Sequence, residues 1–281
     1  MSQSTSRDQP IPSGGRDIST HLGLLGVPSF QPRTVPFDPG YDPQTVVSHL
    51  AQSGHLMAGL KLSMTCWLIA DFRATQAKID AAKSQHIPLI AGGAAFEIAV
   101  QQGMLISYLE LCGALGIDCI EAGEGFTDLG VTAAETVSLA HERGQDVQFE
   151  LGRKHEGPFT RRRVMELIQQ GREWLGAGAV RLVVEARESA AGVGLFDAEG
   201  ELRRELTDLL VEGISLELLC FEAPSKASQF ALLKHLGPDV LLSNVRLEEL
   251  LRVEIFRRGM HADSYGDPRL GTWAPVSGYE L

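Results

Sequence analysis

The chain has 281 residues, of which 44% are hydrophobic and 22% charged, and its formal net charge is -11 at pH 7. This composition is typical of a globular protein with a full core, built as one large α/β barrel or as two ordinary domains. The acidic balance argues against nucleic acid as a partner, and no apolar stretch reaches membrane-spanning length, so we expect no membrane partner either.

The first 20 residues are polar and rich in Ser, Gly and Pro, and they lack the apolar core of a secretion signal. We expect residues 1–20 to be a disordered tail and residues 21–281 to form a single domain. The cysteines form no CxxC pair, which favours reduced, buried thiols and a cytoplasmic location. They are Cys66, Cys112, Cys119 and Cys220.

Short apolar runs recur along the domain and predict buried strands, because they are too short for helices and rich in β-branched and aromatic residues. Their expected last residues are Phe37, Lys61, Ile90, Glu121, Glu150, Glu185, Glu222 and Ser243. Successive ends lie roughly 30 residues apart, which is the length of a strand, a turn and a helix.

Helical patterns lie between these strands and give the fold class. We expect helices at about 44–53, 69–85, 98–115, 131–143, 159–176, 201–213, 226–236 and 246–258. Eight strand–helix units in a chain of this length predict a (β/α)8 TIM barrel. A doubly wound open sheet is the alternative, but it would more often carry a glycine-rich turn after its first strand, and none is present.

The ends of four strands share a feature: each is a glutamate, namely Glu121, Glu150, Glu185 and Glu222. The carboxyl ends of parallel strands meet at one edge, so these side chains should converge. Close carboxylates repel and need a metal, a basic partner or a shared proton. The histidines form no HxH or HxxxH pair, so carboxylate ligands and Mg²⁺ are expected rather than a histidine zinc site.

Basic groups and glycines lie beside these glutamates. Lys154 follows Glu150 closely and is a candidate acid or base. Arg187 offers a fork for phosphate or carboxylate, or forms an internal pair with a glutamate. Lys61 is either an anion ligand or an ion-pair partner of the glutamates. Gly92 and Gly93 form either an anion-binding nest or only a turn.

The same residues resemble those of the phosphosulfolactate synthase family, whose members add sulfite to phosphoenolpyruvate in coenzyme M biosynthesis and which includes bacterial and plant heat-stress relatives. The resemblance runs from about Thr34 to Gly266. It is carried by segments 185–197, 221–226, 244–263, 92–97 and 150–154.

The resemblance implies a (β/α)8 barrel, a carbon–sulfur lyase that uses Mg²⁺, an anionic small-molecule substrate and a homo-oligomer. It also implies that Lys154 is the acid/base group, and we expect Glu150 and Glu185 beside it to be catalytic as well. Substrate binding is expected from Lys61, Gly92, Gly93, Arg187, Glu188, Ser189 and Asn244. Metal binding is expected from Glu121 and Glu222.

Several segments depart from the family pattern. The family's Asp-Lys-Gly is Asp38-Pro39-Gly40 here, and residues 61–66, 92–94 and 121–125 also differ. Two alternatives therefore stand beside sulfite addition to phosphoenolpyruvate. One is a barrel of the same family that adds another nucleophile to an enol phosphate or enol acid. The other is a non-catalytic, stress-related barrel protein.

Overall fold

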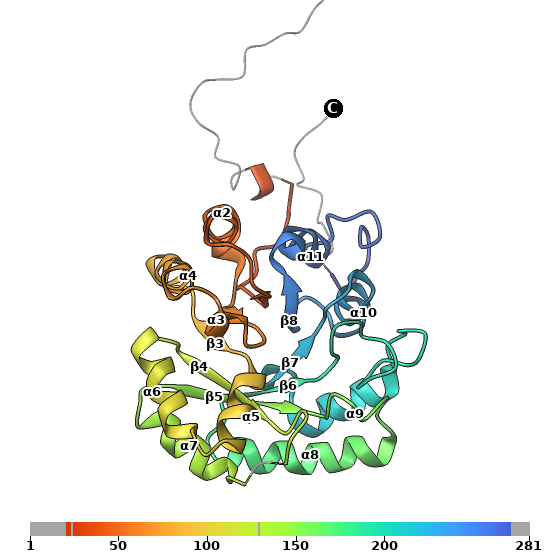
Figure 1. Ribbon diagram of the computed structural model, residues 1–281. Helices are drawn as coiled ribbons and strands as arrows, with labels where there is room; N and C mark the ends of the chain where they lie inside the picture. Colours follow the sequence, from red (N-terminus) through yellow and green to blue (C-terminus); the bar gives the residue numbers. More distant parts are fainter. Residues whose placement is uncertain (1–20, 24, 129, 271–281) are drawn as a thin grey trace, which may run out of the picture.

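The computed structural model describes residues 21–23, 25–128 and 130–270, so the expected tail at residues 1–20 and the last residues, 271–281, lie outside the described part. Eight parallel strands form a closed barrel in the order β1 to β8, and helices surround it (Figure 1). The strands are β1 (Thr34–Asp38), β2 (Leu60–Leu62), β3 (Leu89–Ala91), β4 (Cys119–Gly123), β5 (Asp146–Leu151), β6 (Arg181–Val184), β7 (Leu219–Glu222) and β8 (Leu241–Arg246). The (β/α)8 barrel predicted from the sequence is confirmed.

The helices lie close to the predicted ranges, with three differences. They are α2 (Pro43–Ser53), α3 (Cys66–Ile69), α4 (Phe72–Ser84), α5 (Gly93–Gln101), α6 (Leu105–Leu115), α7 (Ala133–His141), α8 (Arg161–Gly176), α9 (Arg204–Ile214), α10 (Lys226–Leu236) and α11 (Leu250–Arg257). The helix expected at 69–85 is present as α4, but it begins at Phe72 because residues 70–71 interrupt the helical backbone. The single helix expected at 98–115 was wrong, since residues 102–104 divide that region into α5 and α6. Helix α5 also begins directly after β3, several residues earlier than expected.

Local backbone chemistry explains both breaks. Ala70 is extended, and the Asp71 carboxylate then accepts hydrogen bonds from the N–H groups of Arg73 and Ala74, which starts a new helix at Phe72. Gly103 has a φ of 66°, a conformation that ends α5 and that glycine adopts without strain. The hydrophobic periodicity of the sequence continues across such short interruptions, so it does not mark where the helical backbone breaks.

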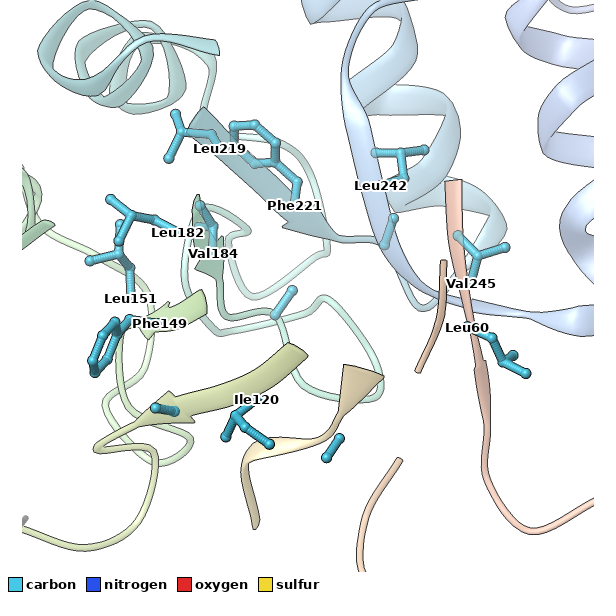
Figure 2. Close-up of a cluster of buried hydrophobic side chains, with 14 of the residues drawn as sticks. Leu60, Ile120, Phe149, Leu151, Leu182, Val184, Leu219, Phe221, Leu242 and Val245 are labelled. Carbon is cyan, nitrogen blue, oxygen red and sulfur yellow. The ribbon is translucent and has the colours of Figure 1, made fainter. Parts of the chain in front are cut away.

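Alternation along the strands separates two apolar layers. Ile120, Phe149, Val184 and Phe221 each immediately precede a glutamate and belong to the large cluster packed against the helices (Figure 2). A second cluster contains Val35, Ile90, Cys119, Val183, Cys220 and Leu241. Because neighbouring strand residues point to opposite faces, the glutamates after these outward residues point into the barrel.

Within the described residues, no helix combines the length and hydropathy needed to cross a membrane. The four cysteines are all free thiols, and three of them are buried.

Candidate active site

A cavity of about 270 Å³ opens at the carboxyl ends of the strands. Its lining comes from the strand ends and the loops that follow them. It consists of Phe37, Pro39, Lys61, Ser63, Met64, Ala94, Glu121, Glu150, Lys154, Glu185, Arg187, Glu188, Glu222, Pro224, Asn244 and Arg246. The four glutamates that end apolar strands thus line one cavity, as their positions in the sequence predict. This is also the face on which barrel enzymes carry their chemistry.

Lys61 is the cation at the base of this cavity. It is 3% exposed, and its Nζ lies 2.5 Å from Glu121 Oε1 and 3.6 Å from Glu222 Oε1. Burial opposes the charge on Lys61, but attraction to Glu121 and Glu222 outweighs burial and raises its pKa. Burial likewise opposes the charge on Glu121, but attraction to the Lys61 ammonium outweighs the effect of burial and lowers the pKa of the Glu121 carboxyl group. Lys61 is therefore an ion-pair partner of the glutamates.

Glu121 and Glu222 have further hydrogen-bond partners. Glu121 accepts hydrogen bonds from Gln148 Nε2 at 2.8 Å and from the Gly93 N–H at 3.2 Å. Glu222 accepts from the Ala186 N–H at 2.9 Å and from Asn244 Nδ2. Both carboxylates are thus held in place by protein donors and by Lys61.

Glu150 and Glu185 differ, because each has a buried Oε2 atom that finds no hydrogen-bond partner among the described residues. Burial is the main cause that raises the pKa of Glu150 well above its ordinary value, and repulsion by Glu121 adds to it. Burial, reinforced by repulsion from Glu222, raises the pKa of Glu185 to about 8. Each side chain is 2% exposed. An unpartnered buried carboxylate oxygen is costly, so this pair can take up a proton or a cation.

Lys154 lies beside this pair, on the loop after β5. Attraction to Glu150 is the largest influence on the Lys154 amine; it outweighs burial and, with Glu185, raises the pKa of Lys154. Its Nζ also lies 5.8 Å from the centre of the Phe126 ring. Lys154 is therefore an ammonium at neutral pH, half-buried at the cavity wall, and it can donate a proton.

Three residues of the cavity wall adopt left-handed backbone conformations. The φ angles are 53° at Met64, 56° at Arg187 and 53° at Asn244. Such conformations are strained for non-glycine residues and cluster at functional sites. At Arg187 the strain is accompanied by a hydrogen bond of 2.6 Å from its N–H to Glu185 Oε1. The turn leaves the Arg187 side chain exposed at the mouth of the cavity.

Some predicted binding residues lie apart from the cavity. Gly92 and Gly93 are outside its lining, and their N–H groups donate to Leu62 O and Glu121 Oε1. These glycines start α5 rather than present a free pair of amides. Ser189 is exposed and also outside the lining, whereas Glu188 contributes to it.

Sequence reasoning missed several residues of the wall. Arg246 lies two residues after Asn244 on β8, so strand alternation places both on the same face and could have revealed it. Phe37, Pro39 and Met64 line the β1–β2 side, where Pro39 and Met64 lie in two of the segments that depart from the family pattern, whereas nothing in the sequence marked Phe37 as a wall residue. The Arg246 guanidinium lies 6.0 Å from the Phe37 ring centre.

The carboxylates of the cavity determine where it could hold a metal ion. Among the described residues, no group of three or more His, Cys, Asp or Glu is placed to hold a metal. The expected pair, Glu121 and Glu222, is bridged by Lys61. The residues that fit a cation are Glu150 and Glu185, through their unpartnered oxygens. Two carboxylates suit Mg²⁺, which usually keeps water and substrate oxygens as its other ligands.

Comparison with known proteins gives the family. Residues 28–263 match the (2R)-phospho-3-sulfolactate synthase (ComA) family. The chain belongs to the phosphosulfolactate synthase family. Phosphosulfolactate synthase from Methanocaldococcus jannaschii is 30% identical over 234 residues, which cover 83% of this chain and 93% of the relative. The family's enzyme from Bacillus subtilis is 29% identical over 191 residues, or 67% of this chain and 75% of that one.

Solved structures outside the family share the fold. The 3-dehydroquinate dehydratase from Geobacillus kaustophilus superimposes with a TM-score of 0.51 at 12% identity, over 81% of this chain and 91% of that chain. This likeness supports the barrel architecture alone. The family relationship makes the chain an enzyme of phosphosulfolactate synthase type.

Proposed function

We propose that this protein adds sulfite to phosphoenolpyruvate, with Mg²⁺, and so forms a sulfonated phospholactate by a carbon–sulfur lyase reaction. The observation that carries the proposal is a lysine ammonium, Lys154, beside two buried carboxylates with unpartnered oxygens, Glu150 and Glu185. The relatives named phosphosulfolactate synthase support the same reaction.

The chemistry needs one proton and a place for developing negative charge. The sulfur lone pair of sulfite attacks C3 of phosphoenolpyruvate and forms the carbon–sulfur bond. The π electrons of the C2–C3 double bond move to C2 and into the adjacent carboxylate. Lys154 then donates a proton to C2, and the phosphate stays on the C2 oxygen. A neutral lysine is left, and solvent reprotonates it because neighbouring carboxylates raise its pKa.

Glu150 and Glu185 would hold the Mg²⁺ in this proposal. Bound there, the ion would supply positive charge to stabilise the carboxylate-conjugated charge that develops during addition. The remaining carboxylates have another task. Glu121 and Glu222 hold Lys61, which keeps the base of the cavity from accumulating uncompensated negative charge.

The anionic substrate groups would be held at the rim. Arg187 is exposed at the mouth, and Arg246 and Asn244 also line the cavity, where Asn244 donates to Glu222. A planar guanidinium binds phosphate through two parallel N–H donors. These groups would orient phosphoenolpyruvate with its C2 near Lys154.

The direct test is incubation with phosphoenolpyruvate, sulfite and Mg²⁺, followed by mass spectrometry of the products. We expect an adduct with the mass of both substrates plus a proton, formed by the wild type and lost in Lys154→Ala. Absence of the adduct at millimolar substrate with intact protein would refute the proposal. The control is Arg162→Ala, a change at an exposed position on α8.

Cation binding has a test that is independent of turnover. Mg²⁺ that binds only the folded state should raise the melting temperature, and a concentration of 100 times Kd would add about 2.7 kcal/mol of stability. Glu150→Gln with Glu185→Gln should abolish this shift. A shift that persists in the double variant would place the ion elsewhere.

One observation favours a second candidate. The β1–β2 side of the cavity is lined by Phe37, Pro39 and Met64, and the lysine of β2, Lys61, is already paired with Glu121. Lys78 of α4 is buried, donates to Asp38 Oδ2 and Tyr41 O, and does not line the cavity. A nucleophile with an apolar group would fit this wall, and the same mass assay with a small organic thiol in place of sulfite separates the two candidate reactions.

We further propose a cytoplasmic homo-oligomer, as expected from the thiols and the family.

A further inference from the structure

One buried carboxylate near the cavity does not line it. Glu97 of α5 is 0% exposed, and it accepts four hydrogen bonds from the loop after β4. Glu97 Oε1 accepts from the Gly125 N–H at 3.1 Å, and Oε2 accepts from the Phe126 N–H and the Thr127 N–H at 2.9 Å each and from Thr127 Oγ1 at 2.9 Å. Four donors offset the cost of burying this charge.

The loop that Glu97 holds is attached to Lys154. The Lys154 N–H donates to Gly125 O at 2.8 Å, and the Lys154 amine lies over the Phe126 ring. A side-chain carbon added at Gly125 would lie 2.9 Å from Glu97 Oε1 and 3.0 Å from Lys154 Cε. Glu97, the backbone of residues 125–127 and the Lys154 side chain are therefore packed in direct succession.

We infer that Glu97 is a positioning residue that fixes the Lys154 amine through the backbone of residues 125–127. It acts without touching the substrate, because it is fully buried and outside the cavity lining. This inference rests on the proposed function for its catalytic consequence, since Lys154 must deliver its proton at a defined place. Its structural part, the restraint of loop and amine, stands independently of any substrate.

A graded series of substitutions at Glu97 tests the restraint. Glu97→Gln retains a carbonyl oxygen that can accept from Phe126 and Thr127 but presents an amide where Gly125 must donate. Glu97→Ala removes every acceptor. A displacement of about 1 Å at a catalytic group can cost about 10²-fold in rate. We therefore expect a kcat loss of that order in Glu97→Ala, a smaller loss in Glu97→Gln, and a nearly unchanged KM for phosphoenolpyruvate.

The matched control lies at the other end of the same loop. Thr132 Oγ1 caps α7 by accepting a hydrogen bond from the Glu135 N–H, so its partner belongs to α7 and not to residues 125–127. Thr132→Ala should lower thermal stability without changing kcat. If it lowers kcat as much as Glu97→Gln does, the effect is general loosening and the inference is overturned.

Two readouts need no substrate. Hydrogen exchange of the amides at residues 125–127 should accelerate in Glu97→Ala and keep its wild-type rate in Thr132→Ala. Labelling of Lys154 by a small amine-reactive reagent, followed by mass spectrometry, should also quicken in Glu97→Ala, while the exposed Lys226 reacts unchanged.

The outcomes separate the two proposals. Faster exchange and labelling in Glu97→Ala, together with no sulfite adduct from the wild type, would refute the proposed function but support the restraint of the loop by Glu97. Unchanged exchange at residues 125–127 and unchanged labelling of Lys154 in Glu97→Ala would overturn the positioning role, whatever the activity. Should Glu97→Ala fail to fold, Gly125→Ala perturbs the same packing from the loop side, and wild-type Lys154 labelling in that variant would equally count against it.

Discussion

Replacement of Lys61 by methionine tests how the carboxylates are kept together. The change removes the ammonium that lies 2.5 Å from Glu121 and 3.6 Å from Glu222, while it keeps most of the side-chain volume. Both Lys61 and Glu121 are buried, so the carboxylate left behind is poorly solvated. Removing one partner of a buried ion pair costs about 3–5 kcal/mol, and we expect Lys61→Met to lose that much stability at pH 8.

The loss of stability in Lys61→Met should be larger at pH 8 than at pH 5. In the wild type the pKa of Glu121 is lowered, so its contribution is present above its ordinary pKa of 4.5 and is lost as pH falls through the folded value. The pKa of Lys61 is raised, so its contribution is full below 10.5 and is lost only as pH rises through the folded value. Both contributions are therefore present at pH 8.

In Lys61→Met the pKa of Glu121 should rise instead, because burial and the other glutamates act without a cation. The carboxyl group then takes a proton as pH falls, and near pH 5 the loss should shrink to about 1–3 kcal/mol, the cost of an unsatisfied buried polar group. Urea unfolding at pH 5 and pH 8, followed by both circular dichroism and tryptophan fluorescence, measures the difference and tests two-state behaviour.

The comparison variant is Arg162→Met. Its side chain is 90% exposed and pairs with Glu166 at 3.3 Å, so its loss should be about 0–1 kcal/mol. A Lys61→Met loss below about 1 kcal/mol at pH 8, or an equal loss at both pH values, would contradict the assignment of Lys61 as the counter-ion of the glutamates.

Three further predictions concern catalysis, pH and packing. Lys154→Ala should lower kcat by about 10²–10⁴-fold with modest change in KM, whereas Arg187→Ala should mainly raise KM, and steady-state kinetics with the mass-detected product separates them. Because burial and Glu222 raise the pKa of Glu185 to about 8, the folded state keeps a proton that the unfolded state releases, and wild-type stability should fall as pH rises from about 4.5 to about 8. Urea midpoints across this range should flatten in Glu185→Gln, and an unchanged slope would contradict the raised pKa. Gly194→Ala should be destabilised by at least about 1–3 kcal/mol, since φ is 58° and the added carbon would lie 2.2 Å from Glu185 O; a wild-type melting temperature would argue against that close approach.

The sequence by itself determined the barrel and the convergence of the four glutamates. Short β-branched runs at regular spacing specify parallel strands, and parallel strands bring their carboxyl ends to one edge. Glu121, Glu150, Glu185 and Glu222 therefore had to meet, because each follows an outward-facing apolar residue on its strand. Breaks inside the helical regions depended on single residues such as Gly103, to which periodicity is insensitive.

Only the tertiary structure decided what each carboxylate does. All four glutamates line the cavity near the carboxyl ends of their strands, yet Glu121 and Glu222 pair with Lys61, while Glu150 and Glu185 retain oxygens without a partner among the described residues. That division depends on distances of a few ångströms between side chains from different strands, which no local pattern encodes.

Glu97 shows the same limit. In the sequence it is one glutamate on an apolar helix, and only the approach of the loop after β4 turns it into the acceptor of four hydrogen bonds. Electrostatic and hydrogen-bond energies fall steeply with distance and angle, so the role of a buried charge is set by the partners that the fold brings to it.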